Sequence, residues 1–170
     1  MKIVLDTNVI VAAFASRGLS HLILRRCLEK HELILSPHII QELETAFIRK
    51  LKMPPEKISL NLEFLEKACH FGDDSDVDPS LCRDPEDLSI LGLALHSIAD
   101  IIVSGDEDLL VIRSFQGIPI RSPREFWELE RKKDPSLLGR MEPSTSKKVH
   151  DKNPRKFPLI RNKRVGTNKR

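Results

Sequence analysis

Short, unbroken runs of apolar residues alternate along the chain with stretches in which apolar residues recur every three or four positions. The short runs lie within residues 2–5, 32–35 and 101–104, and a fourth, interrupted by proline, covers 118–120. A brief apolar run without polar alternation is typical of a strand buried on both faces of a parallel sheet. The pattern therefore predicts three buried strands and a short edge strand at 118–120.

The longer stretches have helical spacing. Helices are expected directly after the first strand and then over these residues: 21–28, 37–51, 56–71, 88–98 and 126–132. Ser36 and Ser122 each precede a proline, the arrangement of an N-cap followed by proline at the first helical position. For the helix after the first strand, Thr7 or Asn8 is the expected cap. The alternation of strands and helices predicts an α/β fold, a three-layer α/β/α arrangement with a central parallel sheet.

Charge divides the chain into two parts. Residues 1–130 hold 14 Lys and Arg against 22 Asp and Glu, a net charge of −8, whereas residues 131–170 hold 14 against 3, a net charge of +11. From Asp134 onward Pro, Ser, Lys and Arg dominate and periodicity is lost. We therefore expect one domain over 1–133 and a basic, mostly disordered tail over 134–170. Such a tail either binds a polyanion, most simply nucleic acid, or only increases solubility.

Composition narrows the function. The chain has one Trp, seven Phe and no Tyr, which argues against binding of single strands on an aromatic platform. It lacks an apolar run of the roughly 18 residues that a membrane helix needs, so no membrane association is expected. Cys27, Cys69 and Cys82 are odd in number and without zinc-like spacing, which suggests reduced thiols in a cytoplasmic protein. Gly-rich phosphate loops and dinucleotide fingerprints are absent from the sequence.

Acidic residues recur where strands end. Asp6 follows the first predicted strand and Asp106 the third, while Glu42 borders the apolar face of the helix 37–51. Asp84 or Asp87 lies at the start of the helix before the third strand. Because the carboxyl ends of parallel strands meet at one edge of a sheet, these side chains are expected to converge. Each could instead be only a helix cap.

Several carboxylates in one cleft repel each other unless a counter-charge is present. Mg²⁺ or Mn²⁺ takes oxygen ligands of this kind and leaves positions for water and phosphate, which suits hydrolysis of a phosphodiester. Two other readings stay open: a non-catalytic RNA-binding or complex-forming module, and a phosphoryl-transfer domain of receiver or haloacid-hydrolase type. The second is disfavoured because Asn8 stands where such phosphatases need a second Asp, and Arg121 where a receiver needs Lys.

Four segments together resemble one known family. The first is Asp6-Thr7-Asn8 after the first strand, and the second is Glu42 in Ser-Pro-His-Ile-Ile-Gln-Glu-Leu. The third is Asp87 in Asp-Leu-Ser-Ile-Leu-Gly-Leu-Ala, and the fourth is Asp106 in Ser-Gly-Asp-Glu-Asp-Leu-Leu. Together they are similar to the segments that carry the acidic site residues of the PIN-domain ribonucleases. The resemblance covers about residues 1–128. Residues 82–87 are similar to the VapC-like subgroup, the toxins of toxin–antitoxin pairs. The basic tail is a departure from the compact family domain.

The resemblance implies a Mg²⁺- or Mn²⁺-dependent endoribonuclease that leaves a 5′-phosphate and a 3′-hydroxyl. It implies an RNA substrate, an antitoxin protein as partner and a homodimer. Asp6 and Asp106 would be direct metal ligands, and Glu42 and Asp87 would complete the catalytic, metal-binding cluster, partly through water. The residues that would assist are Asp84, Asp108, Thr7 and Asn8.

Overall fold

The computed structural model describes residues 1–73 and 85–139. The described strands are β1 (Lys2–Leu5), β2 (Glu32–Leu35), β3 (His70–Phe71), β4 (Ile101–Val103), β5 (Ser114–Phe115) and β6 (Ile118–Arg121). The described α-helices are α1 (Thr7–Ala15), α2 (Leu19–Lys30), α3 (Pro37–Arg49), α4 (Pro55–Ala68), α5 (Pro85–His96), α6 (Glu107–Ile112) and α7 (Pro123–Lys133). A short 3₁₀ helix, η2 (Pro135–Gly139), follows α7.

The strands form one sheet in the order β3-β2-β1-β4-β6-β5. All neighbouring pairs are parallel except β5 with β6. Strand β1 lies between β2 and β4, so the chain connections diverge on either side of it. In open α/β sheets, ligands bind at this kind of switch point, outside the carboxyl ends of the strands. Asp6 and Ser104 follow β1 and β4 directly, and the Asp6 amide donates to the Val103 carbonyl.

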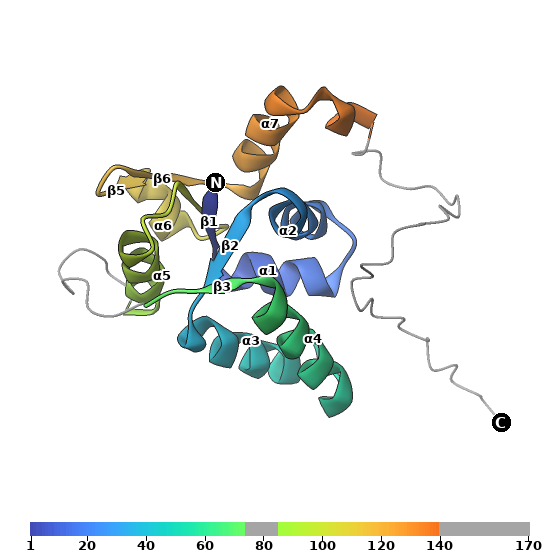
Figure 1. The fold of residues 1–170 in the computed structure, drawn as a ribbon. Coiled ribbons are helices and arrows are strands. Elements are labelled where there is room, and N and C mark those ends of the chain that lie inside the picture. The colour runs from blue at the N-terminus through green and yellow to red at the C-terminus, as the bar shows by residue number, and fades with distance from the viewer. Residues whose placement is uncertain (74–84, 140–170) are drawn as a thin grey trace.

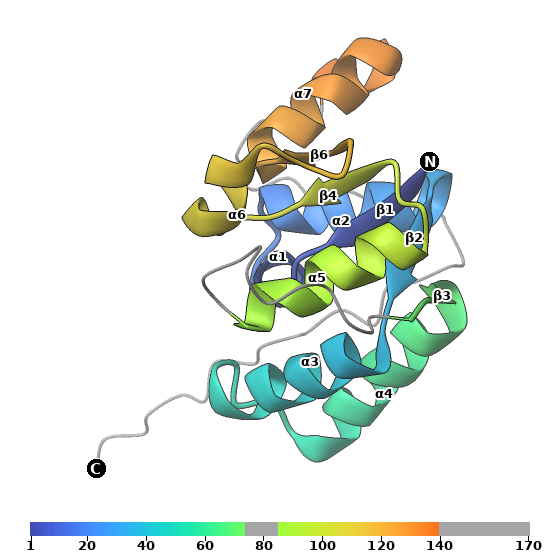
Figure 2. The same ribbon diagram turned by 90° about the vertical axis from the view of Figure 1, so that its left-hand side faces the viewer.

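Helices cover both faces of the sheet, which confirms the three-layer α/β/α arrangement. Figures 1 and 2 show α1 and α2 on one face and α5 on the other. Helices α3 and α4 pack together beyond β3, and α7 packs against α2 and β6 (Figure 1). The middle layer is apolar: Ile3, Val4 and Leu5 of β1 are fully buried. This accounts for their unbroken apolar run, because side chains on both faces of a central strand meet helices.

A buried carboxylate joins α7 to the rest of the domain. Glu130 has a side chain only 1% exposed, and its Oε2 accepts from Arg26 Nε of α2 at 2.8 Å and lies 2.9 Å from His31 Nε2. Burial alone raises the pKa of Glu130, but the donors Arg26 and His31 outweigh it, so the pKa lies below its ordinary value. Glu130 is therefore held ionised between α2 and α7.

Two predictions about strands were wrong. The helix expected over 56–71 ends at Ala68, and His70–Phe71 continue as the parallel edge strand β3 beside β2. The segment 118–120 is not at the edge, because β6 pairs with β4 on one side and β5 on the other. Gln116 and Gly117 have φ values of 49° and 86°, the left-handed pair of a two-residue hairpin turn. That turn makes β5 antiparallel, so the sheet is mixed although mostly parallel.

The remaining differences concern ends of elements. Residues 134–139 were placed in the tail, yet η2 packs on α7 and Leu137 is buried. Residues 140–170, where most of the disordered tail was predicted, lie outside the described residues. Cys27 and Cys69 are free thiols, and Cys82 is outside the described ranges. Within these ranges no single helix is long and apolar enough to cross a membrane; α1 and α2, bent by 109°, pass that test only as a pair.

Candidate acidic site at the switch point

Asp6 links the first strand to the first helix. Its backbone is extended (φ −57°, ψ 140°) while Thr7 is already helical, so Asp6 is the N-cap of α1. Its Oδ1 accepts from the Asn8 amide at 2.9 Å. The expectation that Thr7 or Asn8 caps this helix was therefore wrong, because the chain turns helical one residue earlier. Asp6 is 3% exposed, so its carboxylate needs such partners.

Ser104 joins the two strand-end acids. Ser104 is fully buried, and its hydroxyl donates to Asp6 Oδ2 at 2.5 Å. Ser104 Oγ in turn accepts from the Asp106 amide at 2.9 Å. Asp106 in turn caps α6, because its Oδ1 accepts from the Asp108 amide at 2.8 Å. The carboxyl ends of β1 and β4 are thus tied by one side chain. Sequence reasoning gave Ser104 no role, although Ser104 opens the segment Ser-Gly-Asp-Glu-Asp-Leu-Leu that resembles the PIN family.

Glu42 is connected to the same end of β1 through Thr7. The Thr7 hydroxyl donates to Glu42 Oε2 at 2.5 Å, and His38 Nε2 lies 3.3 Å from Glu42 Oε1. The Glu42 side chain is 25% exposed, in keeping with its predicted position at the border of the apolar face. We call Asp6, Thr7, Glu42, Ser104 and Asp106 the switch-point site. Within it, hydrogen bonds connect Glu42 to Thr7, the residue after Asp6, and Asp6 to Asp106 through Ser104.

The other predicted acids differ in position. Asp87 is buried, at 8% exposure, in the first turn of α5, the helix that packs on β1 opposite α1. Asp108 is exposed in the first turn of α6 and contributes its amide to Asp106. Asp84 lies outside the described residues. Within residues 1–73 and 85–139, hydrogen bonds thus connect the segments that carry Asp6, Glu42 and Asp106. Asp87 lies in α5, which packs on β1 from the opposite face of the sheet.

The donor set suits a hard divalent cation. No three His, Cys, Asp or Glu side chains among the described residues are grouped closely enough to enclose a metal. Mg²⁺, however, is commonly held by one or two carboxylates, with water and substrate phosphate in its remaining positions. Asp6 and Asp106 offer such a pair, and each carboxylate oxygen that accepts one hydrogen bond has lone-pair capacity left. The residues present therefore fit Mg²⁺ or Mn²⁺ bound partly through water.

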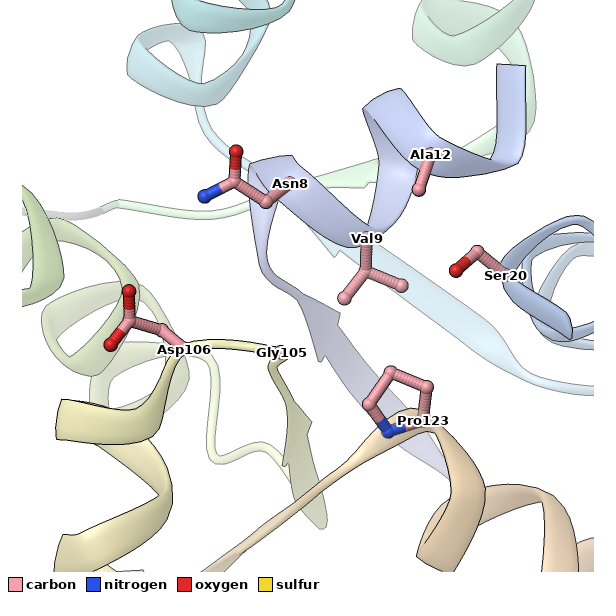
Figure 3. A pocket seen from close by; sticks show the side chains of 7 residues that line it. All are labelled: Asn8, Val9, Ala12, Ser20, Gly105, Asp106 and Pro123. Atoms are coloured by element: carbon pink, nitrogen blue, oxygen red, sulfur yellow. The ribbon is translucent and has the colours of Figure 1, made fainter. Parts of the chain in front are cut away.

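An open pocket adjoins the acids. It has a volume of about 330 Å³ and is lined by Asn8, Val9, Ala12, Ser20, Gly105, Asp106 and Pro123. Figure 3 shows Asn8 and Asp106 at one end, Ser20 and Ala12 at the other, and Val9 and Pro123 between them. Lys50, at the end of α3, donates to Asn8 Oδ1 at 3.3 Å. A cation therefore lies beside the acidic end of the pocket.

The comparisons with known proteins agree with this architecture. The family model described as "PIN domain" matches residues 2–108. Among solved structures, the chain is similar to a chain in the crystal structure of VapBC2 from Rickettsia felis bound to a DNA fragment from their promoter. That match has a TM-score of 0.53 and 17% identity, and covers 72% of this chain and 98% of that chain. No curated protein matches the chain. Since the family model spans Asp6, Glu42, Asp87 and Asp106, the strand-end acids fall inside the matched region, and this chain belongs to the PIN domain family.

Proposed function

We propose that the chain is a Mg²⁺- or Mn²⁺-dependent endoribonuclease, acting in the cytoplasm as the toxin of a toxin–antitoxin pair. The observation that carries the proposal is the link from Asp6 through Ser104 to Asp106 at the ends of two adjacent parallel strands. PIN domains are generally nucleases, and the matched residues include the acids that such chemistry requires.

Each residue of the switch-point site has a definite task in this proposal. Asp6 and Asp106 would hold the metal directly, with Glu42 and Asp87 acting partly through water. Bound Mg²⁺ or Mn²⁺ would supply Lewis-acid polarisation of the phosphate and a water of lowered pKa. Ser104 orients Asp6 by donating to Oδ2, and Thr7 fixes Glu42 in the same way. Because both contacts are hydrogen bonds to carboxylates, they are among the stronger ones available to neutral donors.

Positive charge is available to draw RNA to an otherwise acidic domain. Lys50 reaches the rim of the pocket through Asn8. Residues 131–170 carry a net charge of +11, which favours a polyanion through counterion release. RNA affinity should therefore fall steeply as salt concentration rises.

Cleavage of RNA tests the proposal directly. Asp6→Asn and Asp106→Asn keep a good helix cap, so both variants should fold while losing the charge that holds the metal. We expect cleavage with Mg²⁺ or Mn²⁺ to fall at least about a hundredfold in each, comparable to the loss of one key electrostatic group elsewhere. Glu42→Gln is tested in the same cleavage assay, and Glu44→Gln, at an exposed position of α3, is its matched control. Equal cleavage by wild type and the Asn variants would favour the non-catalytic RNA-binding or complex-forming module instead.

The partners need separate tests. Similarity to a chain of VapBC2 and the VapC-like segment at 82–87 support an antitoxin as partner. In this proposal the antitoxin would insert basic or aromatic groups into the acidic end of the pocket. Induced expression of the wild type in a bacterial host should arrest growth, and Asp6→Asn should not. A small neighbouring gene whose product restores growth and co-purifies with the chain would be the antitoxin. Light scattering of the purified protein tests the expected homodimer.

A further inference from the structure

The pocket beside Asp106 has two chemically different ends. Its acidic end, Asn8 and Asp106, belongs to the rim of the switch-point site. The rest of the lining is the aliphatic wall of Val9, Ala12 and Pro123, with one hydroxyl, Ser20, at the far end (Figure 3). Pockets for small organic groups have this constitution: mostly apolar walls and a few polar groups that fix orientation.

The wall of the pocket formed by the β4–α6 connection carries no side chain at Gly105. A Cβ built on Gly105 would meet no heavy atom within 4 Å, so the backbone there borders empty space. Gly105 is also outside the left-handed region, which means that its missing side chain is not explained by backbone conformation. The volume of about 330 Å³ lies near the lower end of the range for small-molecule sites.

The charge on its phosphates decides which part of an RNA chain can enter this pocket. Phosphates cannot be desolvated against Val9, Ala12 and Pro123 without a paired charge. A nucleobase has apolar faces and a polar edge, and proteins that recognise RNA commonly contact both in unstacked bases. The Ser20 hydroxyl both donates and accepts, so it can pair with the edge of a base.

Resting on the proposed ribonuclease function, we propose that this pocket is a nucleobase subsite, which holds one unpaired base next to the scissile phosphate. The base packs against Pro123 at the start of α7, over a floor to which the nearly buried Val9 of α1 contributes, and its edge meets Ser20 of α2. Substrate choice then depends on single-stranded character at that nucleotide. None of these three residues is among the acids expected to bind the metal.

A series of short single-stranded RNAs, each with one abasic ribose at a different position, tests the subsite. With wild type, cleavage at the main site should fall about fivefold when the abasic ribose occupies one particular position, the lower end of what a lost stacked base costs. Ala12→Leu narrows the pocket from α1, and Gly105→Val narrows it from the opposite wall. Both variants should cleave the intact and abasic RNAs at the same rate. Ala15→Leu, which adds the same side chain at an exposed position of α1, should keep the wild-type difference.

Binding of the same RNA series in EDTA separates this inference from the proposed function. Fluorescence anisotropy should show weaker binding of the same abasic RNA by wild type and no such difference for Ala12→Leu. If cleavage fails but this pattern holds, the subsite stands without the nuclease. Three outcomes overturn the subsite, even if cleavage is observed. These are that wild type binds all the RNAs equally, that it binds no RNA, or that Ala12→Leu and Gly105→Val both keep the difference between intact and abasic RNA.

Discussion

Ser104 provides the most direct test of how the site is held together. Ser104→Ala removes two hydrogen bonds at a fully buried position, one donated to the Asp6 carboxylate and one accepted from the Asp106 amide. A bond to a charged group contributes about 1.5–3 kcal/mol and one between neutral groups about 0.5–1.5 kcal/mol. The free energy of unfolding should therefore fall by about 2–4 kcal/mol, a large share of the 5–15 kcal/mol typical of a domain.

Ser36→Ala is the matched control for this prediction. Ser36 is equally buried, but within residues 1–73 and 85–139 its side chain has a single hydrogen bond, accepted from the Ile39 amide at 3.2 Å as the N-cap of α3. Its loss should cost about 1 kcal/mol. Urea denaturation of the three proteins gives the comparison, provided that the slope with urea is unchanged. A cost for Ser104→Ala no greater than that for Ser36→Ala would refute the bridging role. Cleavage by the folded variant should also fall, because Asp6 loses its orienting donor.

Three further predictions concern stability. Glu130→Gln should lower the free energy of unfolding by about 2 kcal/mol at neutral pH, because Arg26 loses a buried charged acceptor while it keeps its ion pair with Asp134. Since the folded-state pKa of Glu130 is lowered, the difference from wild type should persist above about pH 4.3 and shrink as pH falls through the folded value; a pH-independent difference in denaturation curves would contradict this. Ile98→Gly should raise the free energy of unfolding by about 1 kcal/mol, because Ile98 is 78% exposed and has a φ of 53°; no gain in urea denaturation would contradict the strain. Gly72→Ala should lower the free energy of unfolding by about 1–3 kcal/mol, since its Cβ would lie 2.7 Å from Leu93 Cδ1, whereas Gly105→Ala should be near neutral. Equal melting temperatures for the two variants would count against tight packing around Gly72.

The sequence was sufficient for the features that depend on local pattern. Unbroken apolar runs located β1, β2 and β4, and the Ser-Pro pairs located the starts of α3 and α7. From parallel strands it also follows that Asp6 and Asp106 share one edge of the sheet, where Ser104 links them. These inferences succeed because burial on both faces, capping and strand direction leave direct traces in the order of residues.

Other features depend on long-range pairing that has no local trace. Strand β3 was missed because His70 and Phe71 continue the amphipathic pattern of α4, and only β2 alongside makes them a strand. The β5–β6 hairpin was missed because its turn is Gln116-Gly117, whereas Asn or Asp before the glycine is the usual sign. The hydrogen bond from Ser104 to Asp6 joins residues 98 positions apart and depends on the register of β1 with β4. The pocket required four separate elements to meet, which no motif reports.

Asp6 and Asp106 each begin a helix as well as standing at the candidate site. Selection for folding alone would therefore keep a short polar residue at both positions, even in a descendant that had lost its chemistry. Glu42 lies in the second turn of α3 and caps no helix, so its replacement costs the architecture less. In comparing relatives of this chain, retention of Glu42 is consequently the better sign of a working enzyme, and inactive lineages should lose it first.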